Sequence, residues 1–132
     1  MNRSCHINRY EFVCSSPLAP SLGPYLVSAY SASSTRLMVN WSHLHEEHFL
    51  GQPLGYIIAY YPLDLHDKIK FGNVNFTSNT TTLTNLTVYT MYVINVSAVS
   101  SGGIGPASTA MARTGAEGNI YFFYDTLTAK KL

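Results

Sequence analysis

Residues 92–98 of this 132-residue chain carry an apolar side chain at every second position. Tyr92, Ile94, Val96 and Ala98 fall on one side of an extended chain, and the residues between them fall on the other. A period of two is typical of a β-strand that buries one of its faces. The segment therefore predicts a strand that belongs to a sheet and packs against a core.

Six more segments predict strands, separated by turn residues at the spacing of a β-sandwich. They cover residues 25–30, 36–42, 54–61, 68–71, 80–83 and 107–114. Between residues 24 and 114 the chain shows no helical period, so we expect an all-β fold of seven antiparallel strands. Leu37, Val39 and Tyr60 are expected to face the core. The main predicted core residues are Trp41, Tyr56, Ile58, Leu86, Tyr92, Ile94 and Val96.

In their order and spacing, these segments resemble a fibronectin type III domain over residues 20–114. The resemblance rests on a Leu-x-Val-x-Trp pattern ending at Trp41, a Gly-Tyr-x-Ile-x-Tyr pattern over residues 55–60, a Leu six residues before Tyr92, and a glycine-rich turn. It implies an immunoglobulin-like β-sandwich in which the Tyr92 hydroxyl bonds back to the preceding turn. The family often has Pro-Gly in that turn, whereas this chain has Val88-Tyr89, a departure that we expect to loosen the turn without altering the fold.

The chain outside residues 20–114 lies beyond the resemblance. Residues 15–24 are rich in Pro, Ser and Gly, which propagate neither helix nor sheet. We expect residues 1–19 to be a leader or linker, or the end of a preceding module. Residues 115–132 are expected to be a tail or the start of a further segment, with an aromatic run at 120–124.

Charge and hydropathy exclude several function classes. Charged residues make up 11% of the chain and the net charge is +1, so we expect no nucleic-acid partner. The apolar runs are too short to span a bilayer. No signal peptide is visible at the start, so any membrane attachment is expected only through parts of a longer parent protein.

Six Asn-x-Ser/Thr sequons favour a secreted glycoprotein. They begin at Asn2, Asn40, Asn75, Asn79, Asn85 and Asn95. The glycosylation candidates are Asn75, Asn79, Asn85 and Asn95, whereas Asn40 lies inside a predicted strand next to Trp41 and is the poorest. A composition rich in Asn, Ser and Thr also generates sequons by chance, and that alternative stays open.

Cys5 and Cys14 are the two cysteines of the chain. In an oxidising compartment they can close a small local disulfide loop. The alternatives are that each pairs with a cysteine outside this sequence or that both are free thiols.

Residues 42–48 contain the densest group of side chains that ligate metals. His43, His45 and His48 are the weak metal candidates, but the segment from His45 to His48 is one residue short of the His-Glu-x-x-His motif. A solvated polar loop is the favoured interpretation, with pH-dependent binding as a milder alternative. No nucleophile elbow or phosphate loop is present, so we expect neither a cofactor nor an enzyme.

The resemblance implies a non-catalytic extracellular module that binds proteins or spaces neighbouring domains. Such modules occur in arrays in cell-adhesion molecules and receptor ectodomains, including receptor tyrosine phosphatases. The turn at residues 100–106 lacks Arg-Gly-Asp, so integrin binding is not implied. Tyr30, Tyr61 and Tyr89 are expected to be exposed, although packing on the sheet also explains them. The alternatives are an accessory domain of a secreted multidomain enzyme and a metal-binding loop at the three histidines.

Overall fold

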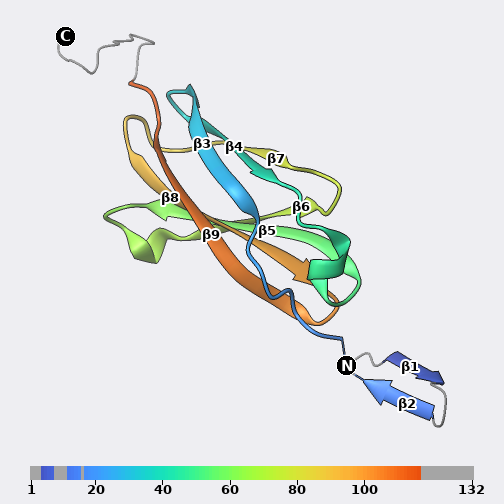
Figure 1. Ribbon diagram of the computed structural model, residues 1–132. Coiled ribbons are helices and arrows are strands. Elements are labelled where there is room, and N and C mark those ends of the chain that lie inside the picture. Colours follow the sequence, from blue (N-terminus) through green and yellow to red (C-terminus); the bar gives the residue numbers. More distant parts are fainter. Residues whose placement is uncertain (1–3, 8–11, 16, 117–132) are drawn as a thin grey trace.

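The computed structural model describes residues 4–7, 12–15 and 17–116, and for residues 4–15 it describes the backbone only. Seven strands form two antiparallel sheets that pack face to face (Figure 1). One sheet has the order β3-β4-β7, with β3 at Tyr25–Ser33, β4 at Arg36–Ser42 and β7 at Thr80–Leu83. The other has the order β6-β5-β8-β9, with β5 at Pro53–Pro62, β6 at Lys70–Asn75, β8 at Met91–Ser100 and β9 at Gly103–Arg113. The predicted fold, a seven-stranded antiparallel sandwich, is confirmed.

Strand β8 is central in its sheet and supplies much of the core. Its four alternating residues, from Tyr92 to Ala98, are all buried between the sheets. On its opposite face, Val93 and Ser97 are also largely covered, because β5 and β9 flank β8 on both sides. A central strand therefore loses most of its solvent contact even on its outer face.

The core also contains two side chains from the segment between β4 and β5. Leu44 and Phe49 are buried there, and the Phe49 ring meets the Tyr56 ring edge-on with centroids 6.0 Å apart. Phe49 ends a short 3-10 helix, η1 (Glu46–Phe49), and a second one, η2 (His66–Lys68), follows β5. The absence of a helical period over residues 24–114 did not reveal these two short helices, because three or four residues are too few to show such a period.

Three strands differ from the prediction by three or more residues at one end, whereas β5 and β8 differ by one or two residues at each end. Strand β3 runs three residues further than expected, to Ser33. Strand β6 begins two residues later, because Lys68 belongs to η2, and its pairing with β5 carries it on to Asn75. Strand β9 begins at Gly103 and includes Pro106, which an edge strand tolerates because its outer N–H groups need no partner.

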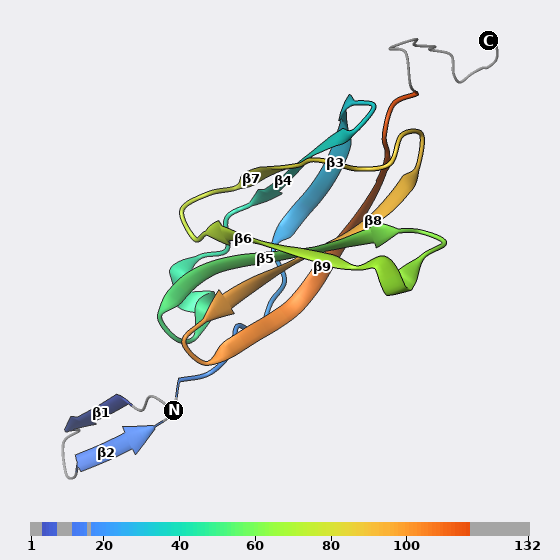
Figure 2. The same ribbon diagram turned by 180° about the vertical axis from the view of Figure 1, so that it is seen from behind.

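A separate hairpin precedes the sandwich and is formed by β1 (Ser4–Ile7) and β2 (Phe12–Ser15). In its register, the Cα atoms of Cys5 and Cys14 lie directly opposite each other. Both views show the hairpin beside one end of the sandwich, while the last described residues leave from the other end (Figures 1 and 2). None of the helices in the described residues is long and apolar enough to cross a membrane.

Candidate functional site

The loop with the three histidines is anchored by its apolar residues. The Leu44 backbone N–H donates a hydrogen bond of 3.1 Å to the buried Tyr56 hydroxyl. His43 and His45 are exposed, His48 is partly exposed, and the rings of His45 and His48 lie 6.3 Å apart. His48 Nε2 lies 3.6 Å from the Glu47 carboxylate. Within the described residues, no three His, Cys, Asp or Glu side chains are grouped so that they could hold a metal ion.

The turn between β7 and β8 is held by the Tyr92 hydroxyl. This oxygen accepts a 2.9 Å hydrogen bond from the Thr87 backbone N–H, as the resemblance implies. Tyr89 adopts a φ of 47°, the left-handed conformation that glycine would take at lower cost. Its backbone N–H donates to the Gly115 carbonyl over 2.9 Å, and the Arg113 guanidinium lies 4.9 Å from its ring centre.

A buried threonine ties the same turn to the end of β9. The Thr114 hydroxyl donates to the Thr87 carbonyl over 2.7 Å and accepts from the Thr90 backbone N–H over 2.9 Å. The turn is therefore fixed at several points, although it lacks Pro-Gly. No sequence pattern indicated this contact, because Thr87 and Thr114 lie 27 residues apart.

The glycine-rich turn between β8 and β9 packs against the N-terminal segment of the sandwich. A side chain at Gly102 would overlap the backbone of Leu18, and a Cβ at Gly105 would lie 2.7 Å from Cβ of Pro20. The Ser100 hydroxyl donates to the Leu18 carbonyl over 2.8 Å. The glycines thus permit a close contact within the chain, and much of this turn is not free to meet a partner.

The sequons lie in different surroundings. Asn75, Asn79 and Asn85 are exposed, whereas Asn40 and Asn95 are partly buried within β4 and β8. Asn95 Oδ1 accepts a 2.7 Å hydrogen bond from the Thr109 hydroxyl on β9. The Asn2 sequon lies outside the described residues, as does the aromatic run at 120–124.

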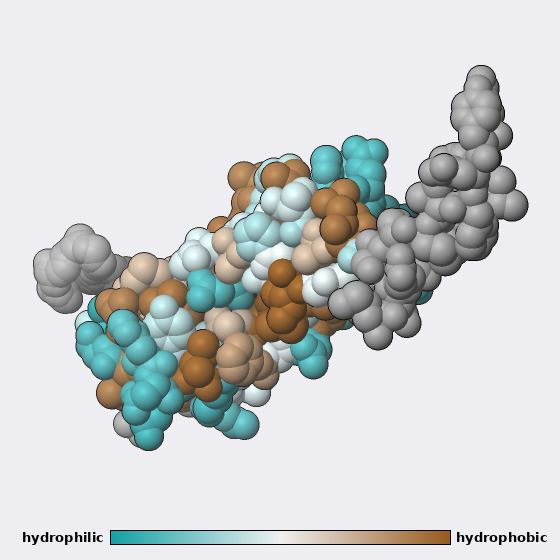
Figure 3. Space-filling view, turned by 90° about the horizontal axis from the view of Figure 1, so that it is seen from below, coloured by the Kyte–Doolittle hydropathy of each residue, from teal (hydrophilic) through white to brown (hydrophobic). Residues whose placement is uncertain are grey.

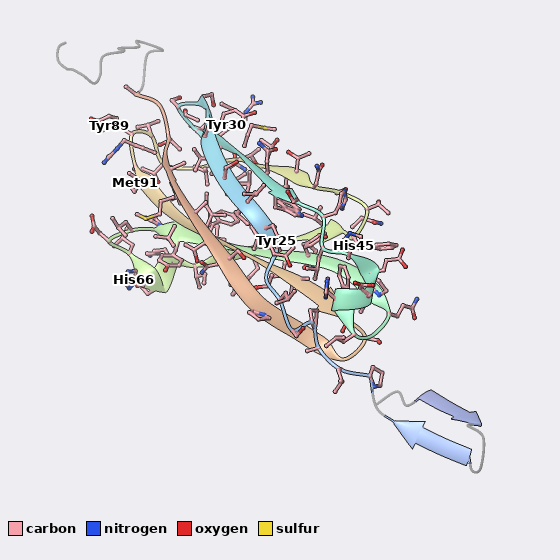
Figure 4. The ribbon with its side chains drawn as sticks, in the orientation of Figure 1. Tyr25, Tyr30, His45, His66, Tyr89 and Met91 are labelled. Atoms are coloured by element: carbon pink, nitrogen blue, oxygen red, sulfur yellow. The ribbon has the colours of Figure 1, made fainter. Side chains whose placement is uncertain are left out.

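Exposed apolar side chains gather at the end of the sandwich formed by the β5–β6 loop (63–69) and the β7–β8 loop (84–90). Figure 4 shows His66, Tyr89 and Met91 at this end, away from His45. Of the three tyrosines expected at the surface, Tyr30 and Tyr89 are exposed, whereas Tyr61 is partly buried with its ring edge-on to His66. Seen from below, brown hydrophobic patches are separated by hydrophilic side chains (Figure 3). The large apolar residues exposed in the two loops are Leu63, Leu65, Ile69 and Tyr89.

A cavity of about 260 Å³ opens between these two loops, and we call it the edge hollow. Its apolar lining comes from Tyr60, Pro62, Leu65 and Leu86, and its charged lining comes from Lys68 and Lys70. Tyr92 and Thr87, the two residues joined by the tyrosine hydrogen bond, also line it. Asn85 lines it as well, so a glycan on that sequon would stand at this cavity. Sequence reasoning missed this cavity, because its walls come from segments that no local pattern connects.

A second cavity of about 270 Å³ lies beside it and shares Pro62 and Leu65. Asp64 and Arg113 both line this second cavity, so its charges are of opposite sign. The charged residues that line the edge hollow are both lysines. The two cavities therefore differ in the ligand charge that they favour.

The strand order, the face-to-face sheets and the tyrosine that closes the β7–β8 turn define an immunoglobulin-like β-sandwich module. The family model described as Fibronectin type III domain matches residues 20–114. The chain belongs to the fibronectin type III family.

Solved structures support the same assignment. The crystal structure of chicken CNTN1 FN1-FN3 domains is 32% identical, with a TM-score of 0.68 over 80% of this chain and 36% of that one. The chain thus spans only about a third of that neighbour. The solution structure of the fn3 domain of human contactin 1 is 30% identical, with a TM-score of 0.65 over 74% of this chain and 81% of that one.

A more distant neighbour shows the fold alone. The third fibronectin III domain of human KIAA0343 protein is 22% identical, with a TM-score of 0.70 over 87% of this chain and 99% of that one. No match was found among curated proteins.

Proposed function

We propose that this chain is a non-catalytic, extracellular module that binds a protein partner and spaces neighbouring domains in a cell-adhesion or receptor-type protein. The observation that carries the proposal is the 32% identity to the chicken CNTN1 FN1-FN3 domains, which are themselves consecutive modules. The two ends of the sandwich support it, since the chain enters at one and leaves at the other (Figures 1 and 2). This geometry suits a linear array.

Placement outside the cell is supported by the sequons. Asn75 and Asn79 lie near β6 and β7 with exposed side chains, so a bulky glycan there would stand in water. Asn40 is partly buried within β4, where it is paired with both β3 and β7. A transferase would have to reach it before the strand folds.

Expression of residues 1–132 behind a secretory signal tests this proposal. We expect a secreted, folded product that carries a glycan on Asn75 or Asn79, seen by mass spectrometry as a loss of mass after glycosidase treatment. Asn75→Gln together with Asn79→Gln should reduce that difference, whereas the matched control Asn40→Gln should leave it unchanged. A secreted and folded product without any glycan would remove the main support for an extracellular glycoprotein.

The parent protein is a finer part of the same proposal. We place the module in the ectodomain of an adhesion or receptor protein, with a receptor tyrosine phosphatase as one such parent. The exons that flank this sequence test this placement. Immunoglobulin-like repeats upstream would support it, whereas a hydrolase domain in the same transcript would contradict it and favour an accessory domain of a secreted enzyme.

A further inference from the structure

We propose that the edge hollow and the adjoining edge of β6 bind an extended peptide segment of a partner protein in which an acidic residue lies two positions from a large apolar one. This inference rests on the interaction role proposed above and specifies where the partner binds and what chemistry it presents. Four features support it, namely charge, apolar lining, strand edge and rigidity.

The charge of the edge hollow is unusual for this molecule. Residues 17–116 contain four Lys and Arg side chains, and two of them, Lys68 and Lys70, line this one cavity. No Asp or Glu lines it, and within the described part of the chain neither lysine makes an ion pair. Asp64 and Asp67 lie in the same loop as Lys68 but do not line the cavity. Two exposed cations that face the cavity and form no ion pair favour an anionic ligand.

The apolar lining selects what accompanies that negative charge. Tyr60 and Leu86 come from opposite sides of the opening, and Pro62 and Leu65 lie beside them. The volume of about 260 Å³ lies just below the roughly 300–1,000 Å³ typical of small-molecule sites. It suits one large apolar side chain of a partner, with the lysines holding the carboxylate of the residue two positions away, which lies on the same face of an extended chain. A sulfated sugar would leave this apolar lining without a matching surface.

The sheet edge next to the cavity provides backbone partners. Among the described strands, β6 pairs with β5 alone, so it forms an edge of its sheet. Lys70, the first residue of β6, lines the cavity, which makes the strand edge and the cavity continuous. An extended peptide can add to such an edge through main-chain hydrogen bonds while one side chain fills the adjacent pocket.

The wall opposite the lysines is already held in place. The Leu86 backbone N–H donates to the Thr35 carbonyl over 3.0 Å, and the Thr87 N–H donates to the Tyr92 hydroxyl over 2.9 Å. A wall fixed by such bonds needs little reordering when a ligand enters, which favours binding.

The test titrates a capped peptide, acetyl-Glu-Thr-Phe-Thr-Glu-amide, whose Glu and Phe side chains share one face when the chain is extended, into isotope-labelled protein of residues 1–132 and follows the amide signals by NMR. We expect the shifts to concentrate at β6 and the β7–β8 loop. The same peptide with Gln in place of every Glu should bind about tenfold more weakly. Shifts centred on the histidine loop or the β8–β9 turn, or equal binding of the Gln peptide, would overturn the proposal.

Lysine variants test whether the carboxylates of the peptide bind at the edge hollow. Lys68→Gln with Lys70→Gln should weaken binding about tenfold, and Lys70→Gln alone about threefold. Arg36→Gln is the matched control, because it removes one exposed positive charge at the start of β4, outside the lining of the hollow. Equal loss from Lys70→Gln and Arg36→Gln would show unspecific attraction and refute the site.

A heparin oligosaccharide is titrated in parallel. Binding of the oligosaccharide at the lysines without binding of the peptide would replace the proposed partner by an anionic glycan. The secretion experiment is independent of these titrations. A secreted product that carries a glycan on Asn75 or Asn79 but binds no peptide would refute this inference and leave the proposed function standing. A glycan on Asn85 in that product would do the same, because Asn85 lines the edge hollow.

Discussion

The hydrogen bond that closes the β7–β8 turn can be tested by removing one atom. Tyr92→Phe deletes the hydroxyl that accepts from the Thr87 backbone N–H and leaves the buried ring in place. Loss of a buried hydrogen bond that leaves a partner unsatisfied costs about 1–3 kcal/mol. We expect the lower half of that range, about 1–2 kcal/mol, because Thr87 lines the open edge hollow and water can reach its N–H.

A second tyrosine in the same core provides an internal comparison. Tyr56 is 1% exposed, and its hydroxyl accepts from the backbone N–H of Leu44, which is 4% exposed. Tyr56→Phe would leave that N–H buried without a hydrogen-bond partner or water. We therefore expect a larger loss of unfolding free energy, about 2–3 kcal/mol. Tyr30→Phe, with a side chain that is 54% exposed, serves as the control with little effect.

Urea denaturation at constant temperature measures the three losses, with the slope compared among variants to confirm that the same surface unfolds. Thermal melts check them, since about 1 kcal/mol corresponds to a shift of about 4–8 °C for a domain of this size. An unchanged midpoint for Tyr92→Phe would show that the turn does not depend on this bond. A smaller loss for Tyr56→Phe than for Tyr92→Phe would refute the argument from water access.

Two further predictions concern the core and the N-terminal hairpin. Trp41→Ala should cost about 3–5 kcal/mol, because the ring is buried against Tyr56 with centroids 5.2 Å apart; a variant that melts within a few degrees of the wild type would contradict a central role for this ring. Cys5 and Cys14 face each other in the register of the hairpin, so we expect the secreted protein to resist alkylation until it is reduced. Alkylation of both thiols without reduction would disprove the local bridge.

Much of the fold could be predicted from the sequence, because the local periodicity of apolar residues indicates the strands and their buried faces. The alternation around Tyr92 and Ile94 predicted a strand with one buried face, and the structure buries that face. The pattern that ends at Trp41 likewise lies on a strand with the predicted bounds, Arg36–Ser42. In β4 burial recurs at every second residue, and in β8 the most deeply buried residues do. The side that faces the core can therefore be inferred without knowing the neighbouring strands.

The ends of strands and the short helices could not be predicted from this periodicity. Strand β6 contains Gly72 and two Asn residues, which are poor strand formers, and it forms because it pairs with β5. Phe49 belongs to a polar segment in which its burial depends on the Tyr56 ring. In these cases tertiary contacts override the local preference of the chain.

The sequence by itself determined the class of fold and the main core positions, because both depend on spacing along single segments. The role of the tyrosine at the β7–β8 turn came from the resemblance of that segment to a known family. Only the tertiary structure decided that Gly102 serves a contact with Leu18 and that Lys68 and Lys70 share a cavity with Leu86. Such neighbours come from separate strands and loops and meet only when the two sheets pack. Their proximity depends on sheet order and register, which no local pattern encodes.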